Sequence, residues 1–288
     1  MAAAAFALLS AALFAGNAVM VRIALAGTTA TTLVFFSLIT NVLTLWAGAA
    51  LTSDLADAVQ PAALIFLGAG LLAPAIARAT LYTSIGMIGV ARATVVANTT
   101  PIFTAIGAAL WLREPMSLSL ALGTVAVVLG VALTSSETLP AGGGHTNRAG
   151  LLLALSTAVL AAVSFLLRKI GLASIPQPAI GSALTVTGAL AGLLPFVLLR
   201  MRREPIRADR RVLAPMIAAA LLSSGGFLSY FLALGLGEVS RVTPLSNTTP
   251  LFAVLLLQLG FRHVEGVSRR TFAGVLLTLA GIFFVLIR

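Results

Sequence analysis

Residues 86–103 read GMIGVARATVVANTTPIF, and residues 235–252 read GLGEVSRVTPLSNTTPLF. At a constant offset of 149 residues, half of the positions are identical, and the identities include four consecutive residues, Asn-Thr-Thr-Pro, that begin at Asn98 and at Asn247. Shared apolar composition does not readily produce such a run of identical polar and proline residues. The two stretches therefore indicate an internal duplication.

The similarity extends outward from these stretches. With a slip of two residues, two glycines of the first copy match two of the second: Gly123 with Gly274, and Gly130 with Gly281. Arg22 likewise matches Arg168 in the first and sixth apolar segments. Glycines seven residues apart lie on one helix face and let helices approach closely. We therefore expect them to pack the fifth and tenth helices within the bundle or between protomers, without contact to the substrate.

The composition places this chain in a membrane. Its 288 residues are 59% hydrophobic and 9% charged, whereas soluble domains carry about 25% charged residues. A bilayer crossing takes about 20 apolar helical residues. Breaks in hydropathy separate ten such segments: 4–24, 31–51, 62–83, 90–112, 118–136, 149–168, 179–199, 213–234, 239–260 and 270–287. Without the alternation of a barrel strand, they predict an all-α integral membrane protein with ten transmembrane helices.

The duplication divides these ten segments into five plus five. Because five is odd, the second copy enters the membrane from the opposite face, which gives two inverted five-helix repeats. This arrangement is typical of secondary transporters that work by alternating access, although a duplication can also simply enlarge a scaffold. The amino-terminal MAAAAFALLS runs directly into the first segment, so we interpret it as a retained helix and not as a signal peptide.

The positions of the charges exclude several functions. The net charge is +10, but the arginines gather in loops. This placement indicates an orientation signal and contact with anionic lipid head groups, and we expect no binding of nucleic acid. The chain has no cysteine, and both histidines, His145 and His263, fall in loops. We therefore expect no metal, no cofactor and no enzymatic activity, since the intramembrane protease motifs are absent. A channel remains the alternative, although no ring of charge suggests one.

The acidic residues bear on energy coupling. All eight fall in loops or at helix ends: Asp54, Asp57, Glu114, Glu137, Glu204, Asp209, Glu238 and Glu265. A proton relay or a site for cationic drugs needs an ionisable residue inside the membrane. We therefore predict facilitated export down the substrate gradient, without obligate proton coupling.

The repeat layout, the polar-then-proline motif, the loop Leu112-Arg113-Glu114-Pro115 and the glycine-spaced fifth and tenth helices resemble the drug/metabolite transporter superfamily, and most closely its EamA-type branch of ten-helix exporters. The second copy departs at residues 262–265, which read RHVE. The resemblance implies EamA-like repeats at 1–140 and 141–288. It also implies export of amino acids or similar small metabolites from a bacterial inner membrane through a central cavity.

Other readings of the substrate and assembly stay open. Drugs or nucleotide sugars are the alternative cargo. We expect a monomer or a weak homodimer, with a small-molecule substrate and the lipid bilayer as its partners.

Prolines mark the predicted helix kinks. Pro101 and Pro250 would free the carbonyls of Ala97 and Ser246, because proline removes one helical hydrogen bond and displaces the carbonyl four residues back. Exposed backbone at membrane depth is tolerated where it lines a watery cavity or is covered by protein. Pro74 predicts a third kink.

Polar and aromatic residues inside the segments are the candidates for a substrate cavity: Asn17, Arg78, Tyr82, Asn98, Ser164, Tyr230 and Asn247. Arg78 could hold a substrate carboxylate or extend to the interface. The asparagines could instead form interhelical hydrogen bonds, and the tyrosines could lie in the interfacial belt.

The orientation is left in conflict. Loops that follow odd-numbered helices hold twelve basic residues and the other side holds five, which places both termini outside the cell by the positive-inside rule. The family resemblance implies that both termini are inside.

Overall fold

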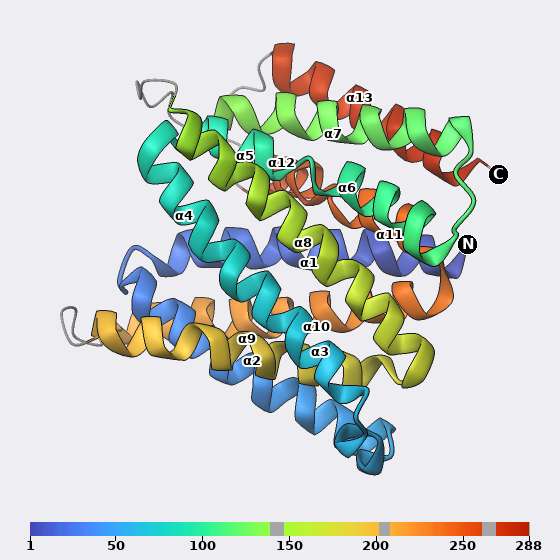
Figure 1. Cartoon of the computed structure of the whole chain (residues 1–288). Helices are drawn as coiled ribbons and strands as arrows, with labels where there is room; N and C mark the ends of the chain where they lie inside the picture. Colours follow the sequence, from blue (N-terminus) through green and yellow to red (C-terminus); the bar gives the residue numbers. More distant parts are fainter. Residues whose placement is uncertain (139–146, 202–207, 261–268, 288) are drawn as a thin grey trace.

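The computed structural model describes residues 1–138, 147–201, 208–260 and 269–287, and this part of the chain is a bundle of helices (Figure 1). Up to residue 138 the α-helices are α1 (Ala2–Ala24), α2 (Ala30–Thr52), α3 (Ala63–Gly70), α4 (Ala77–Ile88), α5 (Val90–Ala97), α6 (Thr100–Gly107) and α7 (Leu118–Thr138). The later ones are α8 (Arg148–Ser174), α9 (Pro178–Met201), α10 (Leu213–Leu236), α11 (Val239–Ser246), α12 (Thr249–Gly260) and α13 (Arg269–Leu286). Short 3-10 segments are η1 (Leu55–Val59) and η4 (Arg210–Val212), and π-helical segments are η2 (Leu71–Ile76) and η3 (Ala108–Leu112).

Eight helical runs in the described ranges are at least 18 residues long and apolar enough to cross a membrane. The predicted all-helical membrane protein is confirmed at this level. Ten crossings are obtained only when α11 and α12 are counted as one broken span and the shorter α13 as another. The predicted repeat boundary at residues 140 and 141, both histidines, and residues 262–265 lie outside the described residues.

Local chemistry explains where several helices begin. The Thr29 hydroxyl accepts a hydrogen bond from the backbone N–H of Thr32 at the start of α2, and the Asn147 side chain accepts one from Ala149 at the start of α8. These are N-caps, which satisfy backbone donors that a helix leaves unpaired. Gly89, with φ of 84° between α4 and α5, adopts a conformation that favours glycine.

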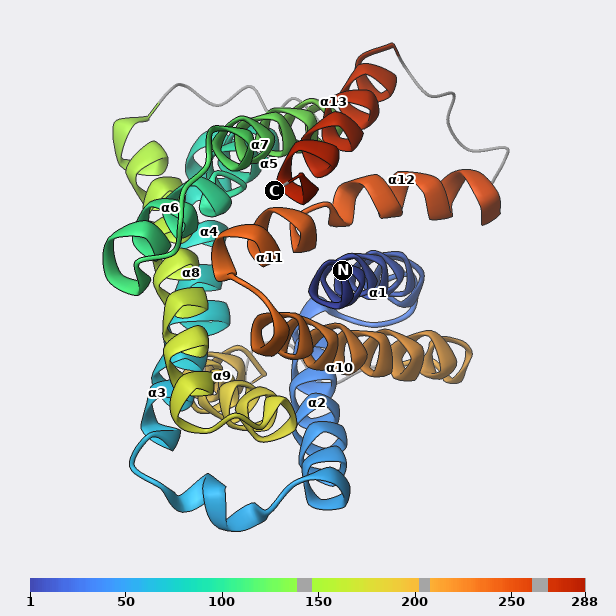
Figure 2. The same ribbon diagram turned by 90° about the vertical axis from the view of Figure 1, so that its right-hand side faces the viewer.

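The helices of the two copies exchange partners. Helix α1 packs on α10, α11 and α12, while α8 packs on α3, α4, α5 and α6. Helix α2 lies against α9, and α7 lies against α13. This pattern is what a two-fold relation between two five-helix repeats produces. Figure 2 looks along the bundle from the end that carries both termini, with α1 and α8 in separate parts of the bundle.

The predicted glycine contact is observed between α7 and α13. A Cβ atom on Gly130 would lie 2.7 Å from the carbonyl oxygen of Gly274, and one on Gly123 would lie 2.9 Å from that of Gly281. The backbone atoms of a helix cannot move aside to relieve such short contacts. The glycines are therefore what lets these two helices meet backbone to backbone.

Two predicted helix boundaries are wrong. The break expected to begin after residue 83 is confined to Gly89, since α4 continues to Ile88, and the break expected to begin at Arg168 starts only after Ser174, where α8 ends. Arg168 is 3% exposed. Its charge is accommodated by tertiary contacts and does not mark a helix end.

Candidate functional site

The Asn-Thr-Thr-Pro motif of the second copy breaks a helix. Helix α11 ends at Ser246 and α12 begins at Thr249. The hydroxyl of Thr249 donates a hydrogen bond to the Ser246 carbonyl at 3.2 Å, and the hydroxyl of Thr248 donates one to the Leu245 carbonyl at 2.6 Å. The carbonyl that the proline frees therefore takes its donor from the motif itself.

The first copy repeats this arrangement. Helix α5 ends at Ala97 and α6 begins at Thr100, whose hydroxyl donates to the Ala97 carbonyl at 2.8 Å. The Thr99 hydroxyl donates to the Val96 carbonyl at 2.7 Å. Both predicted breaks are thus present at matching positions. The threonines serve the backbone of their own helices, as their chemistry predicts.

A third break, predicted from Pro74, separates α3 from α4. Ala73 has φ of −146° and ψ of 125°, which is not helical, within the π-helical segment η2. Two side chains of α8 satisfy the carbonyls there. Ser164 donates to the Ala69 carbonyl at 2.8 Å and to that of Ala73 at 3.1 Å, and Nη2 of Arg168 donates to the Ala73 carbonyl at 2.7 Å.

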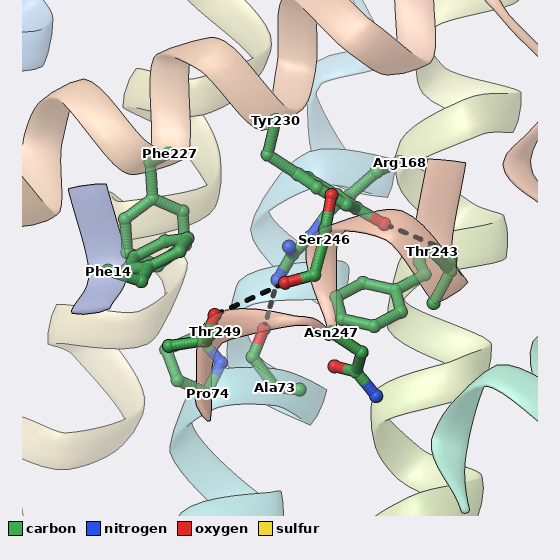
Figure 3. Close-up of a pocket in the computed structure, with 11 residues that line it drawn as sticks. Phe14, Ala73, Pro74, Arg168, Phe227, Tyr230, Thr243, Ser246, Asn247 and Thr249 are labelled. Carbon is green, nitrogen blue, oxygen red and sulfur yellow. Dashed lines mark hydrogen bonds between the residues drawn. The ribbon is translucent and has the colours of Figure 1, made fainter. Parts of the chain in front are cut away.

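The breaks at Ala73 and at Ser246 meet at a cavity of about 230 Å³ (Figure 3). Its lining comes from α1, η2, α8, α10, α11 and α12: Phe14, Ala73, Pro74, Phe165, Arg168, Phe227, Tyr230, Thr243, Ser246, Asn247 and Thr249. The site therefore draws on both predicted repeats. It combines aromatic walls with a few polar groups, the composition typical of small-molecule sites.

Arg168 carries the one charge among the described lining residues. Its guanidinium carbon lies 5.1 Å from the ring centroid of Phe165 and 5.8 Å from those of Tyr230 and Phe231. The faces of aromatic rings attract a cation. Nε of Arg168 is buried and has no hydrogen-bond partner.

Two of the seven predicted cavity residues, Tyr230 and Asn247, line the cavity. Tyr230 is 4% exposed, and its hydroxyl lies 3.5 Å from that of Thr243. Ser164 stands behind the wall, where it holds the Ala73 carbonyl. These three residues are the predicted ones that the structure brings together.

The other four predicted residues do not line this cavity. Asn17 donates to the Ala219 carbonyl at 2.7 Å and so joins α1 to α10. Asn98 occupies the matching break of the first copy, and Arg78 is half-buried in α4. Tyr82 is 53% exposed within α4, although Phe231, its counterpart in the repeat, is fully buried.

Sequence reasoning misses Arg168, because a basic residue followed by Lys169 is typical of the end of a membrane segment. The signal that could have identified it is the apolar stretch of residues 170–175, which extends the helix by another turn and a half. Arg168, and not the cavity candidate Arg78, is the buried basic residue of the cavity lining. Arg22, which matches Arg168 in the repeat comparison, is exposed near the end of α1.

Polar contacts join the helices at the end of the bundle that carries the termini. The Glu114 carboxylate, which follows η3, accepts hydrogen bonds from the backbone N–H groups of Val239 and Ser240 at 2.8 and 2.9 Å. A carboxylate at the first turn of α11 also complements the helix dipole. Nζ of Lys169 donates to the carbonyls of Leu234 and Gly237, both at 2.7 Å, where α10 ends.

The described acidic residues lie at helix ends or between helices, as the sequence predicts. Asp54 and Asp57 lie at η1, Glu238 precedes α11, and Asp209 precedes η4. None of the described acids lines the cavity. In this part of the chain the cavity charge is therefore positive and is not balanced by a carboxylate.

The apolar helices and the cavity at their breaks define a multi-pass membrane protein with a cavity inside the bundle. A model of the EamA-like transporter family matches residues 1–136 and 148–287. The chain belongs to this family, which places it among membrane transporters of the drug/metabolite type and not among enzymes. This confirms the resemblance drawn from the sequence.

Solved structures agree with the fold. A crystal structure of another protein superposes with a TM-score of 0.78 at 17% sequence identity, covering 99% of this chain and 95% of that chain. At this identity the likeness shows the fold alone. No curated protein matches the chain.

Proposed function

We propose that this protein exports amino acids or similar small metabolites by alternating access through the cavity at Arg168. The observation that carries the proposal is that the cavity is built at helix breaks of both copies, with a buried cation and aromatic walls. Discontinuous helices that meet at the interface of inverted repeats form the substrate sites of many secondary transporters. The proposed moving units are the two repeats, 1–140 and 141–288.

The size of the cavity favours small metabolites. At about 230 Å³ it is below the roughly 300–1,000 Å³ of drug-sized sites. A bulky drug or a nucleotide sugar would need a larger space. A cationic drug would also meet Arg168 with no carboxylate among the described lining residues to receive it.

The lack of a carboxylate among the described lining residues also supports uncoupled export. Proton-coupled carriers use an ionisable relay within the membrane, and the described acidic residues lie at helix ends or in connecting segments. We therefore propose facilitated export down the substrate gradient, from the cytoplasm across a bacterial inner membrane. A monomer suffices for this mechanism, since the cavity is complete within one chain.

The test is transport by the purified protein in liposomes. Vesicles loaded with an unlabelled amino acid should take up the labelled form by counterflow, with saturation as its concentration rises. A panel of amino acids, nucleotide sugars and cationic drugs then sets the substrate class. If every amino acid fails, the proposed substrate class is wrong.

The same liposomes distinguish a carrier from a channel, and uncoupled export from proton-coupled export. A pore gives flux without counterflow or saturation. Accumulation driven by a pH difference alone would contradict uncoupled export. Liposomes that carry the Gly130→Leu variant, in which α7 and α13 cannot pack, supply a protein control that should not transport.

A further inference from the structure

Arg168 carries a charge that the protein does not balance. The side chain is 3% exposed, and within the described ranges no acidic side chain pairs with it. Burying a cation without a counter-charge is costly, by several kcal/mol per ion. An ionisable residue inside a membrane span is functional by default for this reason.

The surroundings of Arg168 compensate the charge only in part. Four rings lie within 5.1 to 6.0 Å of the guanidinium carbon, and each attracts the cation weakly. Arginine has five N–H donors. The Ala73 carbonyl takes a hydrogen bond from Nη2, while Nε remains buried without a partner.

Phe14 and Phe227 form an aromatic wall of the cavity, whereas the part around Arg168 mixes polar groups with the rings of Phe165 and Tyr230. Figure 3 shows Phe14 and Phe227 together on one side, and Arg168, Thr243 and Asn247 toward the other. The Phe14 and Phe227 rings meet edge to face, with centroids 5.3 Å apart. A ligand that fits has an apolar body and one polar end.

We propose that the cavity binds small carboxylate anions, with the carboxylate on Arg168 and an aromatic or branched apolar body against Phe14 and Phe227. A planar carboxylate matches the guanidinium donors and would supply the missing counter-charge. No described lining residue is acidic, so a substrate ammonium group finds no counter-charge here. The inference deepens the proposed function, on which it rests, and predicts that an amino group is dispensable.

Ligand-induced thermal stabilisation of the purified protein in detergent tests this without transport. The probes are 3-phenylpropionate, its neutral amide 3-phenylpropanamide, and phenylalanine. The wild type should bind 3-phenylpropionate at least as tightly as phenylalanine, since the ammonium group finds no counter-charge among the described lining residues. It should bind the amide about ten- to a hundredfold more weakly, the range expected for a charge-assisted hydrogen bond.

Two substitutions at position 168 and one matched control complete the test. Arg168→Gln should remove the preference for the carboxylate over the amide, and Arg168→Lys should retain part of it. Arg22→Gln removes the exposed arginine that matches Arg168 in the repeat comparison and should leave all three constants unchanged. If Arg168→Gln does not fold, Arg168→Lys carries the comparison.

The outcomes separate this inference from the proposed function. Equal binding of amide and carboxylate by the wild type would overturn the inference, as would binding of neither. A preference for the carboxylate that survives in Arg168→Gln, or that keeps its full wild-type size in Arg168→Lys, would overturn it as well. Carboxylate binding that depends on Arg168, without counterflow in liposomes, would support the site and contradict the transport proposal.

Discussion

Glu114 joins the two copies at the end of the bundle that carries the termini, and its removal gives the most quantitative prediction. Its carboxylate accepts hydrogen bonds from the N–H groups of Val239 and Ser240, the first residues of α11, and from the Ser240 hydroxyl. Hydrogen bonds to charged groups contribute about 1.5–3 kcal/mol each. Glu114 is half-buried, so water replaces part of the lost interaction, and we take about 1 kcal/mol for each of the three bonds.

Glu114→Ala should therefore lower the free energy of unfolding by about 2–3 kcal/mol, and Glu114→Gln, which keeps one acceptor oxygen, by about 1 kcal/mol. In a chain of this size 1 kcal/mol shifts the thermal midpoint by about 2 °C. Thermal unfolding of the purified protein in detergent should show a drop on the order of 5 °C for the alanine variant and about 2 °C for the glutamine variant.

Glu238 supplies the matched control. It is an acidic residue at the same end, and its side chain pairs with Arg241 three residues on, at 2.8 Å and partly exposed. Exposed pairs of this kind contribute about 0–1 kcal/mol. Glu238→Gln should shift the midpoint by less than about 2 °C. If Glu114→Ala shifts it no more than Glu238→Gln, the contact does not hold the two copies together.

Three further predictions concern packing, the two asparagines and orientation. Gly130→Ala should lower the free energy of unfolding by about 1–3 kcal/mol, because its Cβ would overlap the α13 backbone. Gly48→Ala, with open space around the position, should not destabilise the protein. Equal effects of the two variants on thermal unfolding would refute the close contact. Asn247→Ala should slow liposome transport about three- to tenfold while Asn98→Ala changes it less than twofold, since Asn247 alone of the pair lines the cavity; the reverse order would contradict the site. A phosphatase fused after Arg288 should be active outside the cell, because the described arginines that end α9 and begin α8 lie opposite the termini (Figure 1); an inactive fusion would favour the orientation that the family resemblance implies.

The sequence predicts the helices well where local chemistry decides them. The Asn-Thr-Thr-Pro motifs identify both helix breaks because proline and threonine act on the backbone within one turn. Glycines seven residues apart predict a close-packed face on α7 and on α13, since spacing alone sets the helix face, whereas the structure shows that these two faces cover each other. Pro74 likewise predicts the break at Ala73.

The cavity depends on contacts between distant residues, and here sequence reasoning reached less far. Arg168 is buried because Ala73, 95 residues away in the chain, accepts its hydrogen bond and four rings surround it. A hydropathy profile contains neither fact. Asn17 was predicted to line the cavity, yet its side chain is used by the Ala219 carbonyl of α10, a partner that only the packing of the helices reveals.

The central claim is that this cavity opens alternately to the two faces of the membrane. The chain has no cysteine, so a single cysteine in place of Ser246, which lines the cavity, can be labelled without background. An impermeant maleimide is added to either side of sealed vesicles, with and without Glu114→Ala. The account predicts that the cysteine is labelled from both sides. In the Glu114→Ala variant, labelling should become faster from the side of the termini and slower from the other side. Labelling from one side only, or equal acceleration on both sides, would contradict it.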